Sequence, residues 1–344
     1  MDTLLGVLTV FLTHQPDDIA AYYGRALPEL NAIADVRVNP LERDLTTPEL
    51  IAAAAGCDVI IAHRSTPGEA ALFAESPSLV AFLRCAVDIS TIDVEAAIAA
   101  GVLVARADKS FVASTAELAL ALLLDLSRNV TDSTIDYRNG VLPRQRGGIQ
   151  LRGRTAGIIG YGSIGAYLAQ LLRDMGMTVL VCDPVANATA DGFEQCELID
   201  LLGRSQFVLP LAPATAATEN LIDATALDAM PRGAMLVNVS RGELLDEAAV
   251  AAALDSGHLG GLAMDVGRGA DQRPSPGLAS RPGVIATPHL GGLTPDNADA
   301  QALSSVDQIR AILAGTIPPR TVNAEHAHRL RAWWGLRSIS EETP

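Results

Sequence analysis

Short, continuous runs of apolar residues alternate along the chain with alanine- and leucine-rich stretches that have a helical period. Because polar and apolar positions do not alternate within these runs, they predict strands covered on both faces, as in parallel α/β sheets. The predicted strands form an early series and a late series. The early series is Leu4–Leu12, Asp35–Val38, Asp58–Ala62, Leu79–Cys85 and Leu103–Ala105; the late series is Thr155–Ile159, Thr178–Cys182, Phe207–Leu211, Met235–Val239, Gly261–Val266 and Val284–Ala286.

The two series predict two doubly wound α/β domains. A single long helix is predicted from about Ser114 to Tyr137 between them, long enough to connect two lobes. We expect residues 1–107 and 290–344 to form one domain and residues 108–289 to form a second domain inserted into it. A chain of 344 residues is long enough for two such domains without disulfides or structural metals.

Composition and charge narrow the possible partners. The chain has 25 Lys and Arg against 40 Asp and Glu, a net charge of −15, which argues against nucleic acid or an anionic membrane as the main partner. The four cysteines show neither zinc spacing nor a disulfide framework, and the six histidines are dispersed, so no metal site is expected. A signal peptide requires a basic stretch before its apolar run, and none precedes the apolar run at Leu4–Leu12. We therefore expect a cytoplasmic protein.

The start of the late series carries a glycine motif. The buried strand Thr155–Ile159 leads into Gly160-Tyr-Gly-Ser-Ile-Gly165, an amphipathic helix follows, and the next strand ends at Asp183. In such a βαβ unit Gly160 permits the tight turn, Gly162 lets a pyrophosphate approach, and Gly165 allows close packing of helix on strand. Because the helix begins at Ser163 and Ile164, its N-terminal amides face the phosphates.

An acidic residue at position 183 indicates which dinucleotide is bound. Asp183 would accept hydrogen bonds from the adenosine ribose, and its charge would repel a 2′-phosphate. The following Pro184–Asn187 contains no arginine that could hold such a phosphate. The sequence therefore predicts NAD rather than NADP.

Three later strands end in polar residues of complementary chemistry. Met235–Val239 leads to Arg241, the run from Gly261 ends at Asp265, and Val284–Ala286 leads to His289. In open parallel sheets the ligand lies beyond the carboxyl ends of the strands. An arginine can hold a carboxylate with two hydrogen bonds, and a histidine can exchange a proton near neutral pH. These residues predict hydride chemistry on a small anion, although each could instead have a structural role.

The same segments resemble the signatures of a known family. Leu236–Glu247, Leu259–Val266 and Thr287–Gly292 closely resemble motifs of the D-isomer-specific 2-hydroxyacid dehydrogenases, and Asp88–Asp93 and Ser114–Glu117 resemble its earlier segments. The resemblance covers nearly the whole chain in order. It implies a flavodoxin-like substrate lobe, an inserted Rossmann-type NAD lobe, a cleft between them, and a homodimer formed through the NAD lobes.

The resemblance also implies roles for individual residues. Arg241 would bind and polarise the 2-oxo or carboxylate group of the substrate, His289 would be the general acid/base, and Asp265 would contact the nicotinamide. Arg64 and Ser65, after an early strand, resemble a substrate contact. Pairing of Arg64 with a surface acid is an equal alternative.

Two departures from the family pattern affect these roles. The family usually has a glutamate that pairs with the histidine where this chain has Ala270, so Asp271 would have to bend inward as a substitute. Without a carboxylate the protonated form of His289 is less favoured, which predicts a lower pH optimum for reduction or slower turnover. The family also favours glycines around Ala86, where backbone amides donate hydrogen bonds to the substrate carboxylate, and Asp88 would repel an anion if it faced inward.

The sequence favours an NAD-dependent enzyme that interconverts a 2-oxo acid and its D-2-hydroxy acid. Two alternatives remain: an NAD-binding regulatory protein with weakened catalysis, and a dehydrogenase of another small anion such as formate or phosphite. The sequence also leaves open whether Trp333 and Trp334 pack on the substrate lobe or on a partner subunit.

Overall fold

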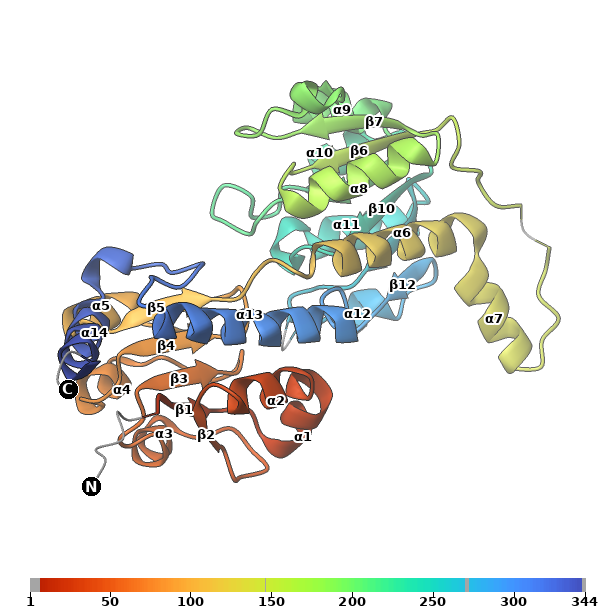
Figure 1. The fold of residues 1–344 in the computed structure, drawn as a ribbon. Coiled ribbons are helices and arrows are strands. Elements are labelled where there is room, and N and C mark those ends of the chain that lie inside the picture. The colour runs from red at the N-terminus through yellow and green to blue at the C-terminus, as the bar shows by residue number, and fades with distance from the viewer. Residues whose placement is uncertain (1–6, 146, 270–271, 342–344) are drawn as a thin grey trace. The chain divides into compact units, whose positions relative to one another are not determined.

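The computed structural model describes residues 7–145, 147–269 and 272–341, which divide into two compact units. The first unit holds the described residues up to Ser110 together with those from Pro295 onward, and the second holds Phe111–Thr294. The C-terminal part of the chain therefore returns to the N-terminal unit, where Figure 1 shows the blue helices α13 and α14 beside the orange strands.

The first unit is built on a five-stranded parallel sheet in the order β2-β1-β3-β4-β5. This order is the flavodoxin-like one, as predicted. β3 and β4 are buried along their whole length, because helices cover both faces of the sheet. The strands are β1 Thr9–Leu12, β2 Asp35–Val38, β3 Val59–Ala62, β4 Ala81–Arg84 and β5 Leu103–Arg106.

Short helices connect these strands, and two longer ones come from the C-terminal part of the chain. The α-helices of this unit are α1 Pro16–Asp18, α2 Ala26–Asn31, α3 Thr47–Ala53, α4 Ala70–Glu75, α5 Val94–Ala100, α13 Pro295–Leu313 and α14 His328–Glu341, with a π-helical turn at Ile19–Tyr23 and a 3-10 turn at Ala324–His326.

The two adjacent tryptophans of α14 belong to this unit. Both pack against its apolar core. The indole of Trp333 donates to Asp58 Oδ1 at 3.1 Å, and that of Trp334 donates to the carbonyl of Ile312 at 2.7 Å. The sequence leaves open whether the two tryptophans pack on the substrate lobe or on a partner subunit. In the structure they pack on the first unit.

The second unit is built on a seven-stranded parallel sheet in the order β12-β11-β10-β9-β6-β7-β8. The strand order reverses between β6 and β9, which is the topological switch point of a Rossmann-type fold. The predicted two-domain α/β fold class is confirmed. The strands are β6 Thr155–Ile159, β7 Thr178–Cys182, β8 Glu194–Gln195, β9 Phe207–Pro210, β10 Ala234–Asn238, β11 Leu259–Met264 and β12 Val284–Ala286.

The predicted single helix from Ser114 to Tyr137 is wrong. The structure has α6 at Val112–Arg128 and α7 at Val130–Arg138, separated by Asn129 in the left-handed conformation at φ +54°. Asn is one of the few non-glycine residues that adopt this conformation readily. Thr131 donates its amide to Asp125 at 2.8 Å, which fixes the start of the second helix. Figure 1 shows the resulting change of direction between α6 and α7.

The other helices of the second unit cover the two faces of its sheet. They are α8 Ser163–Asp174, α9 Leu198–Arg204, α10 Ala224–Ala229, α11 Glu247–Asp255 and α12 Pro276–Ala279, with 3-10 turns at Ala188–Asp191 and Gly242–Leu244. Among the described residues no helix combines the length and the apolar character that crossing a bilayer requires.

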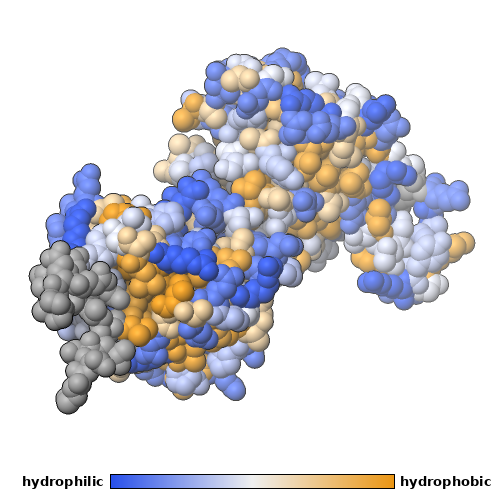
Figure 2. Space-filling view, in the orientation of Figure 1, coloured by the Kyte–Doolittle hydropathy of each residue, from blue (hydrophilic) through white to orange (hydrophobic). Residues whose placement is uncertain are grey.

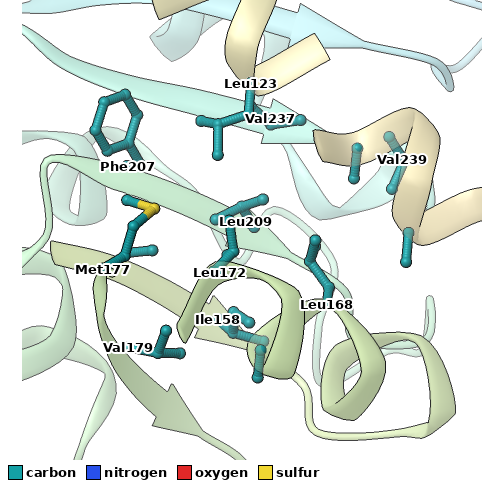
Figure 3. Packing of buried hydrophobic residues seen from close by; sticks show 14 of the residues in the cluster. Leu123, Ile158, Leu168, Leu172, Met177, Val179, Phe207, Leu209, Val237 and Val239 are labelled. Carbon is teal, nitrogen blue, oxygen red and sulfur yellow. The ribbon is translucent and has the colours of Figure 1, made fainter. Parts of the chain in front are cut away.

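A buried apolar cluster lies beneath the glycine motif of the second unit. Leu123 of α6 and Leu168 and Leu172 of α8 pack with side chains of the central strands, including Ile158 and Val237 (Figure 3). Each of these five side chains is fully buried. The helix that begins at the glycine turn is therefore held firmly against the sheet, which fixes the position of its N-terminus.

Candidate active site

The glycine motif forms the turn between β6 and α8. Gly160 adopts φ +100°, and a β-carbon there would lie 2.7 Å from the amide nitrogen of Ala212. A β-carbon on Gly165 would overlap the carbonyl oxygen of Gly160, so only glycine lets the helix approach the strand this closely. These two glycines are required by the fold itself.

Gly162 differs from its two neighbours in the motif. A β-carbon built on Gly162 has no atom within 4 Å, so this glycine is not needed for packing. It lies at the N-cap of α8 without a side-chain cap, beside the exposed Ser163 and the half-buried Ile164. The first amides of a helix have no partner within the helix and carry its positive dipole end. Open space in front of such amides fits the pyrophosphate of a dinucleotide.

Asp183, at the end of β7, is oriented by backbone amides. Its Oδ2 accepts from Tyr161 at 2.6 Å, and its Oδ1 accepts from Val185 at 2.8 Å and Ala186 at 2.7 Å. Partial burial by itself would raise the pKa of Asp183, but these three hydrogen bonds outweigh it and hold the pKa below its usual value. A carboxylate oxygen can accept two hydrogen bonds, so the charged Oδ2 retains capacity for a ribose hydroxyl.

Three neighbouring strands end in register at the same edge of this sheet. Asn238 of β10 pairs with Met264 of β11, which pairs in turn with Ala286 of β12. Arg241 follows three residues after the first of these strand ends, and His289 follows three residues after the last. The parallel sheet thus brings the loops of Arg241 and His289 to the edge at which the glycine turn also lies.

The Arg241 loop is held by buried polar side chains. Asn238, which is fully buried, donates through Nδ2 to the carbonyl of Arg241 at 2.8 Å and accepts from the amide of Ser240 at 3.0 Å. Ser240 donates through Oγ to the carbonyl of Ala212 at 2.8 Å. The half-buried guanidinium of Arg241 donates from one Nη to the Ser240 carbonyl at 2.8 Å. A guanidinium has five N–H donors, so the group can still bind an anion.

The His289 loop is held by Asp265. Oδ1 of this fully buried carboxylate accepts from Thr287 Oγ1 at 2.6 Å and from the amide of Leu290 at 2.7 Å, and Oδ2 accepts from the amide of Gly291 at 2.8 Å. Asp265 therefore fixes the chain on both sides of the histidine. The sequence predicts a nicotinamide contact for Asp265 and does not reveal this role in the loop.

His289 itself has an unusual backbone conformation. Its φ is +64°, and its amide donates to the carbonyl of Thr287 at 3.0 Å. Positive φ at a non-glycine residue is uncommon and occurs often where surrounding contacts impose it at functional sites. Ala270 and Asp271, on which the expected carboxylate partner depends, lie outside the described residues.

The predicted substrate contacts of the first unit follow β3 and β4. Arg64 and Ser65 are exposed, on the loop directly after β3. Ala86 is half-buried after β4, and its carbonyl accepts from Ala107 at 3.0 Å. Asp88 is exposed, and its carboxylate accepts from the amide of Ser90 at 2.9 Å and from its hydroxyl at 3.0 Å.

Arg84, which the sequence reasoning had not singled out, organises the loop of Arg64. It is fully buried and donates to the carbonyls of His63, Arg64 and Thr66. Burial lowers the pKa of Arg84 to about 10, so the group stays charged at neutral pH. These carbonyls turn inward to the guanidinium, whereas the side chains of Arg64 and Ser65 are exposed. The signal in the sequence was an arginine within the apolar run Leu79–Cys85.

The second unit brings to one edge of its sheet a glycine turn with open space at a helix N-terminus, a guanidinium that could bind an anion, and an imidazole that could exchange a proton. Among the described residues no group of histidine, cysteine and carboxylate side chains is placed to hold a metal ion. These groups can perform hydride transfer to or from a small anion with a bound dinucleotide.

Comparison with known proteins agrees with this chemistry. Residues 120–291 match the model of the D-isomer specific 2-hydroxyacid dehydrogenase NAD binding domain, which supports NAD as the coenzyme. The chain is 31% identical over 277 residues to a glyoxylate reductase of Korarchaeum cryptofilum, covering 78% of this chain and 83% of that protein. It is 36% identical over 279 residues to a D-3-phosphoglycerate dehydrogenase of Mycobacterium tuberculosis, covering 80% of this chain and 53% of the relative.

The chain thus spans about half the length of the phosphoglycerate dehydrogenases that it matches. Among solved structures it is similar to a D-isomer specific 2-hydroxyacid dehydrogenase from a Polaromonas species, with a TM-score of 0.82 and 26% identity. That comparison covers 92% of this chain and all of the other.

Proposed function

Because the chain belongs to the NAD-dependent D-isomer-specific 2-hydroxyacid dehydrogenases, we propose that it interconverts a 2-oxo acid and the corresponding D-2-hydroxy acid. The observation that carries this proposal is the register of β10, β11 and β12, which brings the loops of Arg241 and His289 to one edge of the NAD-binding sheet. A regulatory protein would not need both groups there.

In the proposed reaction the bound nicotinamide supplies or accepts the hydride. Arg241 holds the carboxylate or the 2-oxo oxygen of the substrate and polarises it. His289 gives a proton to the 2-oxo oxygen during reduction and takes it back from the hydroxyl during oxidation. Asp265 holds the loop of the imidazole through three hydrogen bonds, and its contact with the nicotinamide is also part of the proposal.

The first unit is proposed as the substrate lobe. The side chains of Arg64 and Ser65 and the amide of Ala86 would contact the acid. Asp88, which gave reason to doubt that the lobe accepts an anion, is exposed and hydrogen-bonded to Ser90.

A carboxylate partner for His289 is proposed at Asp271. An Asp271→Asn variant is expected to shift the pH–rate profile of reduction, because removal of a nearby negative charge disfavours the imidazolium. A profile unchanged from the wild type would exclude Asp271 from this role.

The experiment that tests the proposed function follows NADH oxidation with glyoxylate, pyruvate, hydroxypyruvate and bulkier 2-oxo acids, and NAD reduction with D-3-phosphoglycerate. Formate and phosphite are included with NAD as the other small anions. Turnover of a 2-oxo acid that His289→Ala abolishes supports the proposal. The control is His326→Ala, which changes an exposed histidine of the first unit and should leave turnover unchanged. Tight NADH binding without turnover of any of these acids would support the regulatory alternative.

A homodimer is proposed from the surface of α7 and the segment after it. None of the α7 side chains is buried, and five large apolar residues are exposed: Val130, Ile135, Tyr137, Val141 and Leu142. Figure 2 shows orange patches among the blue on this part of the surface, at the right of the view. Such apolar surface is normally covered by a partner, and a second copy is the partner that the family resemblance implies.

Light scattering is expected to give about twice the 35.9 kDa of one chain. Leu142, which is 83% exposed, offers a test, since Leu142→Asp should weaken the dimer without disturbing the core. A monomeric wild type would contradict the dimer.

We also propose a cytoplasmic location, because the four cysteines are free thiols.

A further inference from the structure

The segment from Asp265 to Arg268 contacts both loops of the candidate active site. At one end, the carboxylate of Asp265 holds the chain around His289. At the other end, Arg268 reaches the chain that follows Arg241. The proposed mechanism uses the first contact and leaves Arg268 without a role.

Arg268 binds several backbone and side-chain acceptors at once. One of its Nη atoms donates to the carbonyl of Glu243 at 3.0 Å, to that of Leu245 at 3.2 Å and to Asn220 Oδ1 at 2.7 Å. The same nitrogen lies 2.8 Å from Glu219 Oε1. The guanidinium therefore ties together residues 243–245, which follow Arg241, and residues 219–220, which belong to the loop after β9.

These two stretches also pair directly with each other. The amide of Asn220 donates to the carbonyl of Glu243 at 2.8 Å, and that of Ile222 donates to Leu244 at 2.9 Å. Arg268 lies across this pairing, because it binds the Glu243 carbonyl and the Asn220 side chain together.

A backbone contact beside Arg241 adds to this connection. A β-carbon on Gly242 would overlap the backbone of Gly267, so the residue after Arg241 packs directly against the residue before Arg268. Both glycines are buried. The Arg241 loop therefore cannot move far without displacing the segment of Arg268.

We propose that Arg268 is a positioning residue that sets the placement of Arg241 relative to His289. This inference rests on the proposed function, since it assigns Arg268 to the same reaction. The segment Asp265–Arg268 holds the imidazole loop at one end and the guanidinium loop at the other. An exposed ion pair with Glu219 alone would contribute little, so the hydrogen bonds to the backbone carbonyls carry the effect.

The kinetic test compares Arg268→Ala with Arg268→Lys and with a matched control. Displacement of a substrate-binding group by about 1 Å can reduce turnover by up to about 100-fold, so Arg268→Ala should lower kcat/KM for the 2-oxo acid by about 10- to 100-fold. The dissociation constant of NADH should change less than about twofold, because the glycine turn and Asp183 do not contact Arg268. Lysine keeps the charge but lacks the guanidinium, and it should restore part of the activity.

Arg204→Ala is the control, since Arg204 lies in the same unit, also forms exposed ion pairs, and ends α9 on another part of the sheet. Its kcat/KM should equal that of the wild type. Glu219→Gln removes only the ion pair and should stay within about threefold of the wild type. Equal kcat/KM for Arg268→Ala and Arg204→Ala would overturn the proposal.

Hydrogen exchange tests the positioning independently of turnover. In Arg268→Ala the amides of Asn220, Ile222 and Leu245 should exchange faster than in the wild type, whereas Arg204→Ala should leave them unchanged. If the wild type reduces no 2-oxo acid, the proposed function fails, and the exchange rates still decide whether Arg268 holds this loop. Unchanged exchange in Arg268→Ala would refute the contact as a restraint.

Discussion

The three glycines of the β6–α8 turn allow the contributions of folding and coenzyme binding to be separated. Gly162 adopts φ −76° and ψ −167°, an extended conformation that any residue can adopt, and its β-carbon would meet open space. Gly165 is enclosed by the carbonyl of Gly160, and Gly160 has a positive φ. Gly162→Ala should therefore fold normally and bind NADH poorly, whereas Gly165→Ala should fold poorly.

The magnitudes follow from opposing terms. Replacing glycine by alanine where the backbone permits it stabilises a protein by about 0.4–1 kcal/mol through the unfolded chain. Alanine is a poorer N-cap than glycine, which costs a few tenths to about 1 kcal/mol. The two terms nearly cancel for Gly162→Ala, so the free energy of unfolding should change by less than about 1 kcal/mol. A methyl group in the path of the pyrophosphate should weaken NADH binding at least tenfold, or about 1.4 kcal/mol.

Urea denaturation and NADH titration measure the two quantities on the same samples. For Gly162→Ala we expect an unchanged urea midpoint and a dissociation constant for NADH raised at least tenfold. For Gly165→Ala we expect a lower midpoint or no folded protein. Wild-type NADH affinity in Gly162→Ala would refute the assignment of this turn to the pyrophosphate. A large loss of stability in the same variant would show that the space at Gly162 is not open.

Three further predictions concern other parts of the chain. Asp183→Ala combined with Val185→Arg should shift the ratio of kcat/KM values from NADH toward NADPH, and an unchanged ratio would contradict the role of Asp183 at the ribose. Burial lowers the pKa of His14 from 6.5 to about 3, so protonation of the unfolded chain should destabilise the protein as pH falls below 6.5. Between pH 6.5 and 5 the free energy of unfolding should therefore fall by about 1.6 kcal/mol less in His14→Gln than in the wild type. Equal pH dependence in the two proteins would contradict this prediction. Because Asn129 has a positive φ, Asn129→Ala should lower the free energy of unfolding by about 1 kcal/mol, whereas Asn129→Gly should not. Urea denaturation of the two variants measures this difference.

Strand positions were predictable because burial on both faces requires an uninterrupted apolar run. Thr155–Ile159, Thr178–Cys182 and Val284–Ala286 are strands with the predicted limits. The two-residue strand Glu194–Gln195 was missed, since it contains no apolar residue. Its pairing with β7 depends on a long-range contact that local sequence does not encode.

The helix break at Asn129 was missed for a related reason. The apolar pattern continues through α6 toward α7, and an asparagine can be accommodated within a helix at modest cost. The left-handed conformation is favoured here by the contact of Asp125 with Thr131, six residues apart. The pattern of apolar positions gives no information about such a contact.

Glycine spacing and strand-end residues indicated most of the candidate site. The βαβ unit located Gly160 to Asp183, and the strand ends located Arg241 and His289, since parallel strands end at the same edge. The sequence did not reveal that Asp265 holds the histidine loop, because its acceptors are backbone amides whose positions depend on the folded chain. Arg268 was missed for the same reason.

The buried guanidinium of Arg84 makes the loop after β3, which is proposed to contact the substrate, resistant to rearrangement. A shift of the carbonyls of His63, Arg64 and Thr66 would take three acceptors from a buried positive charge and leave it the hydroxyl of Thr91, which is unfavourable inside the protein. The backbone of this loop therefore does not depend on which side chains stand at the exposed positions 64 and 65. Exchanging the residues at positions 64 and 65 should therefore alter which acids are accepted while the scaffold beneath them keeps its shape.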